Sequence, residues 1–510
     1  MKTRGRALVA AGALIWLSGC AVGPDYELPA IAVPKIFGTA ALTPGVPTAS
    51  PPTDLVRWWG VLHDARLNAL VERAVASNPD VEIALTRVQE AREQQIAVAG
   101  QMLPTVGGSA TVATGTGTDL TKGRAAQSIR AGDANTGFRQ IWQMAGFDAG
   151  WELDLFGKYR RELEATINDT EAQIDMRNAV LISVIGDVAR NYLDIRGLQL
   201  QLEIVRSNIA TAQRTVELLQ TRFDRGLSNE LDLTLAKREL ATEEARLPEL
   251  DAAISAAQSR LALLLGTYAA DVAGAVQGPG KLPVVPARLR PGAPVDLLRR
   301  RPDVRATERE LAAATARIGV ATADLFPSVA LTAGLGQQGA RGQLGNTPPV
   351  IHGPIWSFGP AAYWPLLDFG RLDALVNIED MRAHEALVNH KKTIIAAVEE
   401  VDQAIKQYRF DLRRHSQLLL ALDASHRAVT VATERYERGV TDFLNVLDAQ
   451  RQDYALAEQT AIAAEIVVLR YVAFFKALGG GWELYAELPP IPVAQPAVIA
   501  AGRRLTNGWH

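Results

Sequence analysis

The chain has 510 residues, a formal net charge of −3 and a single cysteine. A charge this close to zero gives no reason to expect a nucleic acid as a partner, because nucleic acids attract strongly basic surfaces. The single cysteine excludes a disulfide bond within the chain.

Residues 1–19 have the pattern of a lipoprotein signal peptide. A basic start is followed by an apolar run, Ala7 to Leu17, that is too short to span a bilayer. The motif Leu17-Ser18-Gly19-Cys20 resembles a bacterial lipobox, in which the cysteine is acylated and becomes the mature N-terminus. Ala21 follows it, and the lack of an aspartate there resembles lipoproteins sent to the outer membrane. An ordinary signal peptide with an incidental cysteine is the alternative.

Residues 20–56 are predicted to form an extended, lipidated N-terminal segment, because Pro and Thr are frequent from Pro24 to Pro52. Further along, no segment has the pattern of a transmembrane helix. The apolar stretch from Ala461 to Phe475 is interrupted by Glu465 and Arg470. If the chain spans a membrane, it must therefore do so with strands.

The sequence repeats itself over more than 200 residues. Asn78-Pro79-Asp80-Val81 returns as Arg301-Pro302-Asp303-Val304, and Leu155-Phe156-Gly157-Lys158 returns as Asp368-Phe369-Gly370-Arg371. Landmarks that recur in the same order indicate a duplicated structural unit. We predict a first repeat over residues 57–283, a second over 284–481 and a C-terminal tail over 482–510.

Each repeat is predicted to contain a long helical hairpin. From Leu181 to Phe223, apolar residues recur at alternating steps of three and four, which is typical of a coiled-coil seam. A helix from Lys158 to the turn would be about 100 Å long at about 1.5 Å per residue. Pro248 should kink the returning helix or mark a change in its packing. The hairpins reverse at Arg225-Gly226-Leu227-Ser228 and at Arg438-Gly439-Val440-Thr441, where glycine permits a positive φ.

Each repeat should also contain two strands. Apolar and polar residues alternate from Phe147 to Leu155 and from Ser328 to Leu335. Thr105 to Gly115 is a weaker candidate, and Trp356 to Leu366 is a fourth that is rich in aromatic residues. Each is about as long as a tilted membrane strand needs to be. Glycine-rich loops are predicted to connect the strands over residues 116–146 and 336–353.

Four strands are too few to close a barrel. An open sheet in lipid leaves backbone N–H and C=O groups unpaired at its edges, which costs several kcal/mol for each group. The smallest membrane barrels have about eight strands. Strands in a membrane would therefore require the chain to oligomerise, whereas a soluble β-sandwich would not.

Taken together, these features resemble the bacterial outer-membrane efflux proteins, the TolC-like outer membrane factors, and most closely their lipidated NodT-type branch. Besides the lipobox and the two hairpin turns, the resemblance is carried by Gly23-Pro24-Asp25-Tyr26, Trp58-Trp59, Asn78-Pro79-Asp80, Trp151-Glu152-Leu153-Asp154-Leu155-Phe156-Gly157 and Ala477-Leu478-Gly479-Gly480-Gly481-Trp482. It implies a mainly α-helical fold with long antiparallel coiled-coil helices and a membrane β-barrel. A homotrimer would combine its strands into one twelve-stranded barrel in the outer membrane, above an α-helical tunnel in the periplasm.

The resemblance implies a passive exit duct of a tripartite efflux system for drugs and other small molecules. Its partners would be a periplasmic adaptor (membrane fusion) protein and, through it, an inner-membrane efflux pump. Neither catalysis nor a cofactor is implied. Two other functions fit the architecture: a coiled coil that spans the periplasm without transport, and the exit duct of a type I protein-secretion system.

The resemblance also suggests functional residues. The turns at Arg225, Gly226, Leu227 and Ser228 and at Arg438, Gly439, Val440 and Thr441 match adaptor-docking tips, unless they are simple turns. Close to these turns, Asp232, Tyr436 and Asp448 match a network that closes the tunnel, and Asp442 is a further candidate. Thr441 replaces a network arginine and Asn445 replaces a second ring aspartate. The acids could instead be solvated helix residues.

Two other signals point elsewhere. Gly334-Leu335-Gly336-Gln337-Gln338-Gly339 matches a dinucleotide-binding pattern, but a loop-like sequence follows where such a site needs a helix. We therefore predict a loop between strands there. His384 and His390 are six residues apart, which is not the spacing of metal ligands on one helix face.

Overall fold

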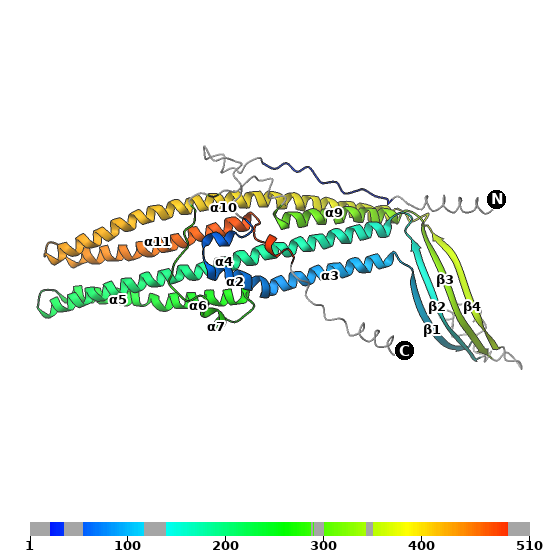
Figure 1. The fold of residues 1–510 in the computed structure, drawn as a ribbon, viewed down its shortest axis with the longest axis horizontal. Helices are drawn as coiled ribbons and strands as arrows, with labels where there is room; N and C mark the ends of the chain where they lie inside the picture. Colours follow the sequence, from blue (N-terminus) through cyan, green and yellow to red (C-terminus); the bar gives the residue numbers. More distant parts are fainter. Residues whose placement is uncertain are drawn as a thin grey trace. The chain divides into compact units, whose positions relative to one another are not determined.

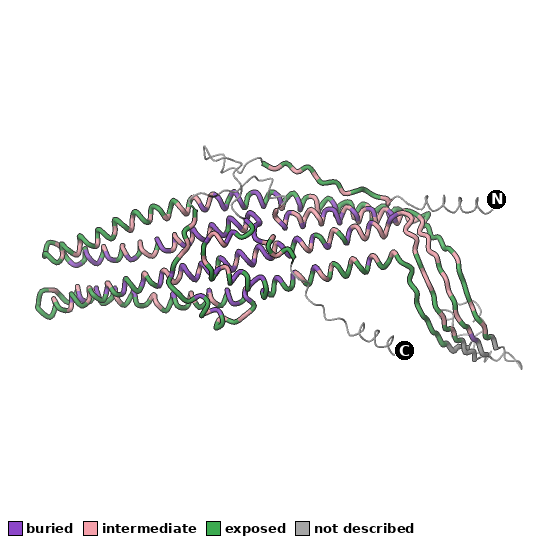
Figure 2. Tube along the Cα trace, in the orientation of Figure 1, coloured by how far each residue is buried: buried purple, intermediate pink, exposed green. Residues whose placement is uncertain are grey.

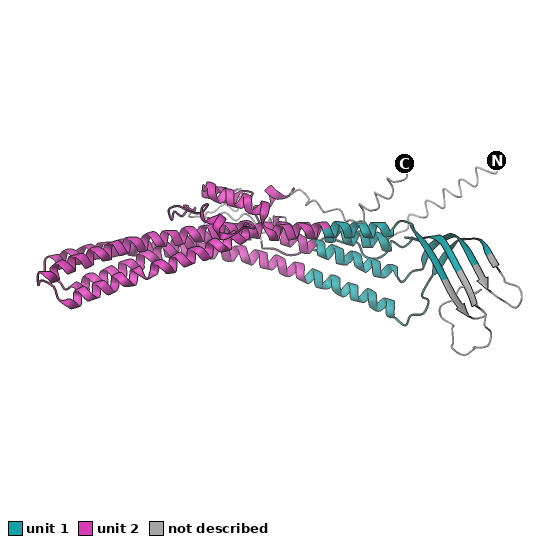
Figure 3. Cartoon of the chain, turned by 90° about the horizontal axis from the view of Figure 1, so that it is seen from below, with its two compact units in different colours: residues 1–29, 90–170, 309–388 teal, residues 30–89, 171–308, 389–510 magenta. Residues whose placement is uncertain are grey.

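The computed structural model describes residues 21–34, 55–116, 139–286, 289, 300–342 and 350–487. The chain divides into two compact units, shown in Figure 3. Unit 1 combines residues 1–29, 90–170 and 309–388, and unit 2 combines residues 30–89, 171–308 and 389–510. Each unit therefore draws on both sequence repeats.

Unit 2 is built from helices (Figure 1). The elements that lie wholly within it are η2 (Trp58–Leu62), α2 (Ala65–Ser77), α5 (Glu230–Glu244), α6 (Arg246–Leu264), α7 (Ala269–Ala273), α11 (Phe443–Ala477) and η4 (Glu483–Tyr485). Four longer helices contribute residues to both units: α3 (Pro79–Gln101), α4 (Lys158–Asp224), α9 (Pro302–Ala323) and α10 (Arg371–Glu437). None of the described helices has an apolar stretch long enough to cross a bilayer.

The long helices predicted from the coiled-coil seam are confirmed. α4 and α10 occupy equivalent places in the two repeats and have the same length, 67 residues. Seam residues of α4 such as Leu181, Ile185 and Val188 are buried. The return from α4 is interrupted at Ala245, between α5 and α6, so that Pro248 falls in the first turn of α6. Proline is tolerated there because the first N–H groups of a helix need no intrahelical acceptor.

The largest core of unit 2 surrounds two adjacent tryptophans. Trp58 and Trp59 are fully buried, and the ring of Trp58 stacks on that of Phe475 with 5.4 Å between the ring centroids. Tyr192 and Tyr471 belong to the same cluster. This core joins helices from both repeats, which explains why neither repeat forms a body of its own.

Unit 1 contains a four-stranded antiparallel sheet in the order β1-β2-β3-β4. Its strands are β1 (Thr105–Thr116), β2 (Arg139–Leu153), β3 (Ser328–Gly342) and β4 (Val350–Tyr363). The four predicted strands are thus present, but the predicted loops are too long. The G-x-G-x-x-G sequence lies inside β3, so the prediction that it forms a loop is wrong.

Glycine explains this error. Glycines break the alternation of apolar and polar residues from which we predicted the strands, yet the ladder continues through them. Gly336 pairs with Gly146 across β3 and β2. A Cβ atom at Gly146 would lie 2.8 Å from the carbonyl oxygen of Leu335, so these glycines allow two backbones to approach closely.

The register gives the sheet two chemically different faces. Phe147, Leu335 and Trp356 are direct neighbours on one face, and 66%, 65% and 78% of their surfaces are exposed. The other face places Asp148 beside Gly334, which pairs in turn with Ser357. Figure 2 shows how little of the strands is buried. β1 and β4 are the edges of the sheet, and neither has a further partner strand in the described part of the chain.

Candidate functional site

Both helical hairpins reverse through the same backbone motif. Gly226 and Gly439 have φ angles of 68° and 71°, in the left-handed region that favours glycine. The next amide, of Leu227 or Val440, donates to a carbonyl five residues earlier, at 2.8 and 2.9 Å respectively. The eight predicted tip residues therefore form two equivalent turns.

The tips present apolar and basic side chains to solvent, and they are mostly green in Figure 2. Leu227 and Val440 are exposed. Arg438 reaches Glu434, near the end of α10, at 3.7 Å, whereas no ion pair to Arg225 occurs among the described residues. Exposed arginines beside exposed aliphatic side chains leave both tips open to a partner protein.

A small core lies just behind the tips and joins four helices. It is formed by Leu219 of α4, Leu233 and Ala236 of α5, and Phe443, Val446 and Leu447 of α11, with Tyr436 of α10 packed against it. The ring of Tyr436 meets the ring of Phe443 edge-on, with 5.7 Å between centroids. This core therefore holds the two hairpins together near their turns.

An arginine that the sequence analysis overlooked completes this contact. The guanidinium of Arg222, near the end of α4, lies 4.8 Å from the centroid of the Tyr436 ring. Thr441 stands where the resemblance leads one to expect an arginine, and here Arg222 supplies a cation from the other hairpin. Arg222 begins the repeated Arg-aromatic-acidic-Arg-Gly motif of the two turns, so the repeat itself could have drawn attention to it.

Asp232 is bound within its own turn. Its carboxylate accepts from the hydroxyl of Ser228 at 3.3 Å, and its backbone N–H donates to the side chain of Asn229, the N-cap of α5, at 2.7 Å. Among the described residues, no hydrogen bond joins Asp232 to Tyr436. The pair suggested by the resemblance is therefore not formed within one chain.

The remaining candidate acids lie on or beside the exposed side of α11. Asp442 is the N-cap residue of α11 but makes no capping hydrogen bond with its side chain. Asn445 donates to the hydroxyl of Thr441 at 2.7 Å. Asp448 is exposed and follows Asn445 by three residues, which places both on one helix face. The described residues contain no group of His, Cys, Asp and Glu side chains that could hold a metal ion.

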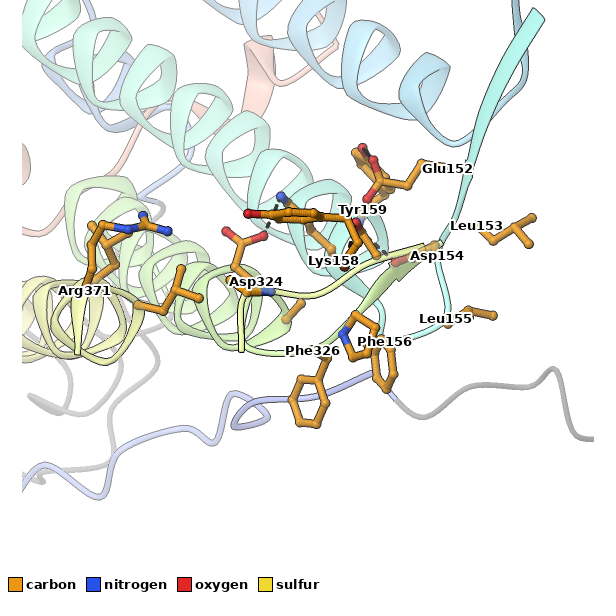
Figure 4. Close-up of a pocket in the computed structure, with 17 residues that line it drawn as sticks. Glu152, Leu153, Asp154, Leu155, Phe156, Lys158, Tyr159, Asp324, Phe326 and Arg371 are labelled. Carbon is orange, nitrogen blue, oxygen red and sulfur yellow. Dashed lines mark hydrogen bonds and ion pairs between the residues drawn. The ribbon is translucent and has the colours of Figure 1, made fainter. Parts of the chain in front are cut away.

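In unit 1, a cavity of about 350 Å³ lies where strands meet helices (Figure 4). Lys158 and Asp324 form an ion pair at 2.7 Å beside it, and the hydroxyl of Tyr159 donates to Glu152 at 2.9 Å. Burial, reinforced by the hydrogen bond to Glu152, raises the pKa of Tyr159 to about 12, so its hydroxyl remains a proton donor at neutral pH. Polar side chains thus continue from the polar face of the sheet into the helices.

The chain is similar to known proteins along most of its length. The family model described as outer membrane efflux protein matches residues 70–267 and 293–480. Nodulation protein T of Rhizobium leguminosarum bv. trifolii is 30% identical over 479 residues, which cover 92% of this chain and 96% of that protein. Outer membrane protein OprJ of Pseudomonas aeruginosa is also 30% identical, with 92% and 94% of the two chains covered.

A solved structure agrees with these sequence relationships. The structure of the outer-membrane channel OprN is 34% identical and superposes with a TM-score of 0.78, covering 91% of this chain and 100% of the other. The helices, the four-stranded sheet and the duplicated order of elements are therefore those of an outer-membrane channel. The chain belongs to the outer membrane efflux protein family and is an efflux channel of the outer membrane.

Proposed function

We propose that three copies of this chain form one passive exit duct, through which small molecules leave after delivery by an inner-membrane pump and a periplasmic adaptor. The observation that carries the proposal is the open sheet of unit 1. Its edge strands β1 and β4 lack further partners in the described chain, and its apolar face is exposed. A membrane protein cannot leave such edges in hydrocarbon, because their N–H and C=O groups would be unsatisfied.

Pairing between copies solves this problem. β4 of one copy can pair with β1 of the next, and three four-stranded sheets exceed the roughly eight strands that the smallest membrane barrels require. The apolar face that carries Phe147, Leu335 and Trp356 would then face lipid, and the face with Asp148 and Ser357 would line the lumen. Substrates pass along this lumen without chemical change.

Small molecules are the favoured cargo because the relatives are named for chemically unrelated small solutes. They include the cation efflux protein CusC of Escherichia coli, the toluene efflux protein TtgF and the pyoverdine export protein OpmQ, both of Pseudomonas putida. Relatives of one architecture are thus named for different solutes, which favours a duct without a specific binding site. Selection would then take place in the pump.

Three further assignments belong to this proposal. Cys20, which lies outside the described residues, would carry the lipid anchor. The exposed tips around Gly226 and Gly439 would dock the adaptor. Asp232, Tyr436, Asp442 and Asp448 would line or brace the periplasmic gate, with Arg222 as the cation bound to Tyr436.

The test uses the full-length protein purified in detergent. Native mass spectrometry should give three times the chain mass, and the same preparation should conduct ions in planar bilayers. A monomer without conductance would contradict the proposal. A stable trimer without conductance would instead favour a coiled coil that only spans the periplasm.

Cargo is tested in cells. Deleting the gene should make the bacterium more sensitive to small toxic compounds, and the full-length chain should restore resistance. Replacing Gly226 and Gly439 with valine should abolish restoration, because valine resists the positive φ of both turns. Loss of a secreted protein from the medium without a change in sensitivity would favour the protein-secretion alternative.

A further inference from the structure

The residues that follow Cys20 are bound to unit 1 by an unusually close set of contacts. The N–H of Val22 donates to the carbonyl of Phe156 at 3.1 Å. Gly23, with a φ of 91°, touches Gly319 of α9 so closely that a Cβ atom on Gly23 would overlap the Cα of Gly319. A Cβ atom on Gly157 would likewise lie 2.6 Å from the Cα of Ala21. Glycines thus make room for the segment on both sides.

A buried arginine holds the same segment. Arg161 of α4 is only 5% exposed. Its guanidinium donates to the carbonyls of Val22 at 3.2 Å and Gly23 at 3.3 Å, and to the carboxylate of Asp25 at 2.6 Å. A buried charge is costly unless its hydrogen bonds are satisfied. Residues 21–25 therefore complete the surroundings of Arg161, whose other carboxylate partner is Glu164 at 2.8 Å.

The bound segment lies next to two aromatic side chains at the junction of strands and helices. The rings of Phe156 and Phe326 stack with 4.7 Å between their centroids. In Figure 4 both rings point away from the polar side chains of the cavity, and the N-terminal segment, in pale blue, passes close to them. β2 ends at Leu153, so this aromatic pair lies at the end of the sheet where the helices begin.

We propose that Gly157, Arg161 and Gly319 form a receptor groove for the processed N-terminus, and that this groove places the acyl chains of Cys20 against Phe156 and Phe326. The inference rests on the proposed lipidation of Cys20. Adjacent Cα atoms are about 3.8 Å apart, so fixing Ala21 and Val22 confines the acylated residue to the same neighbourhood. The partner that this surface fits is therefore the chain's own lipid anchor.

The test is a photocross-link from the aromatic pair to the acyl chain. Cells are fed an alkyne-tagged fatty acid, and Phe326 is replaced by p-benzoylphenylalanine in the full-length protein. After irradiation and digestion, the tag should be found by mass spectrometry on the peptide that contains residue 326. The matched control carries p-benzoylphenylalanine at Ser357, on the polar face of the same sheet, and should acquire no tag.

Gly23→Val tests whether the groove is responsible. Only the bound segment is changed, so the helices and the sheet keep their sequence, and ion conductance in planar bilayers checks that the channel still assembles. The cross-link at residue 326 should fall at least about tenfold, because valine at Gly23 would overlap Gly319. Arg161→Met should also lower the yield of the cross-link at residue 326.

The outcomes separate this inference from the function. An acylated protein whose cross-link is absent, or unchanged by Gly23→Val, would overturn the groove and leave the exit duct standing. A protein without any acyl tag would remove the anchor and this inference with it, while conductance would still report on the duct.

Discussion

The carboxyl group of Glu465 lies buried between two long helices of unit 2. Glu465 belongs to α11 and is 8% exposed. It fits against Gly197 of α4, where any Cβ atom would collide with it, and it accepts a hydrogen bond from Gln201 at 3.2 Å. Burial is the main cause that raises the pKa of Glu465 to about 8. The negative charge of Asp194 and a hydrogen bond between the two carboxyl groups add to the rise.

This carboxyl group should make the stability of unit 2 depend on pH. The pKa of Glu465 is higher in the folded protein than in the unfolded chain, where it is near 4.5. The full stability is therefore present below about pH 4.5 and is lost as pH rises towards about 8. Stability should therefore fall across that interval, by up to ~1.4 kcal/mol per pH unit. Glu465→Gln should flatten the dependence and raise Tm at alkaline pH, as measured by circular dichroism.

The ion pairs near Glu465 do not depend on its charge, and an exposed glutamate on another helix serves as the control. Asp194 is paired with Arg260 of α6 at 2.7 Å, and Arg470, further along α11, is paired with Asp411 of α10 at 3.0 Å. These pairs remain intact in Glu465→Gln. Glu82→Gln, at an exposed position of α3, should leave the pH profile of Tm unchanged. Equal profiles for Glu465→Gln and the unmodified protein would show that the buried carboxyl group does not titrate in this range.

Asp448 has the opposite environment and a different expected effect. It is exposed on α11, on the same helix face as Asn445. If three copies bring it to the tunnel axis, a ring of carboxylates would favour cations. Alanine is smaller than aspartate and would leave a wider constriction, so Asp448→Ala should raise single-channel conductance. It should also weaken cation selectivity, whereas Asn445→Asp should strengthen that selectivity. Identical channel recordings for all three proteins would argue against a ring.

At the scale of secondary-structure elements, the two helical hairpins are joined behind their tips by the stack of Arg222 on Tyr436. A cation on an aromatic face contributes about 0.5–1 kcal/mol at exposed sites. Because this contact holds the two hairpins together behind their tips, its loss should favour the open state. Arg222→Gln should therefore raise the open probability of the channel about two- to fivefold in planar bilayers. Tyr436→Leu should act similarly, and the double variant should add little to either.

Two controls separate the effect of the Tyr436 ring from the effects of its hydroxyl group and of net charge at the tip. Tyr436→Phe keeps the aromatic face and should behave like the unmodified channel. Arg225→Gln removes an arginine of the same hairpin that forms no ion pair among the described residues, and it should leave the open probability unchanged. If Arg225→Gln opened the channel as much as Arg222→Gln, net charge at the tip would explain the effect.

The elements also show what the sequence can and cannot predict. The 67-residue helices follow from a coiled-coil seam that is written locally in the chain. The strands were located, but the segments predicted for β2 and β3 were too short, because Gly146 and Gly336 carry no side chain to mark a face. The stack of Arg222 on Tyr436 joins residues from different repeats, and periodicity carries no signal for such a contact.

At the scale of the whole molecule, one sheet face must meet a different environment from the other. The exposed neighbours Phe147, Leu335 and Trp356 form an apolar surface that is suited to lipid. Thr332 lies on the opposite face, between Gly150 and Gly359. A soluble sandwich would cover the apolar face with protein, and no described element provides such a cover.

Charge placed on either face therefore distinguishes lipid from lumen. Leu335→Arg would put a cation into hydrocarbon at a cost of about 2–4 kcal/mol per chain near the bilayer midplane. We expect it to remove most of the trimer from outer-membrane fractions, as measured by native electrophoresis after detergent extraction. Thr332→Arg adds the same side chain to the lumen and should leave the amount of trimer unchanged while lowering cation selectivity. If both variants assembled equally well, the face of Leu335 would not contact lipid, and the shared barrel would lose its physical basis.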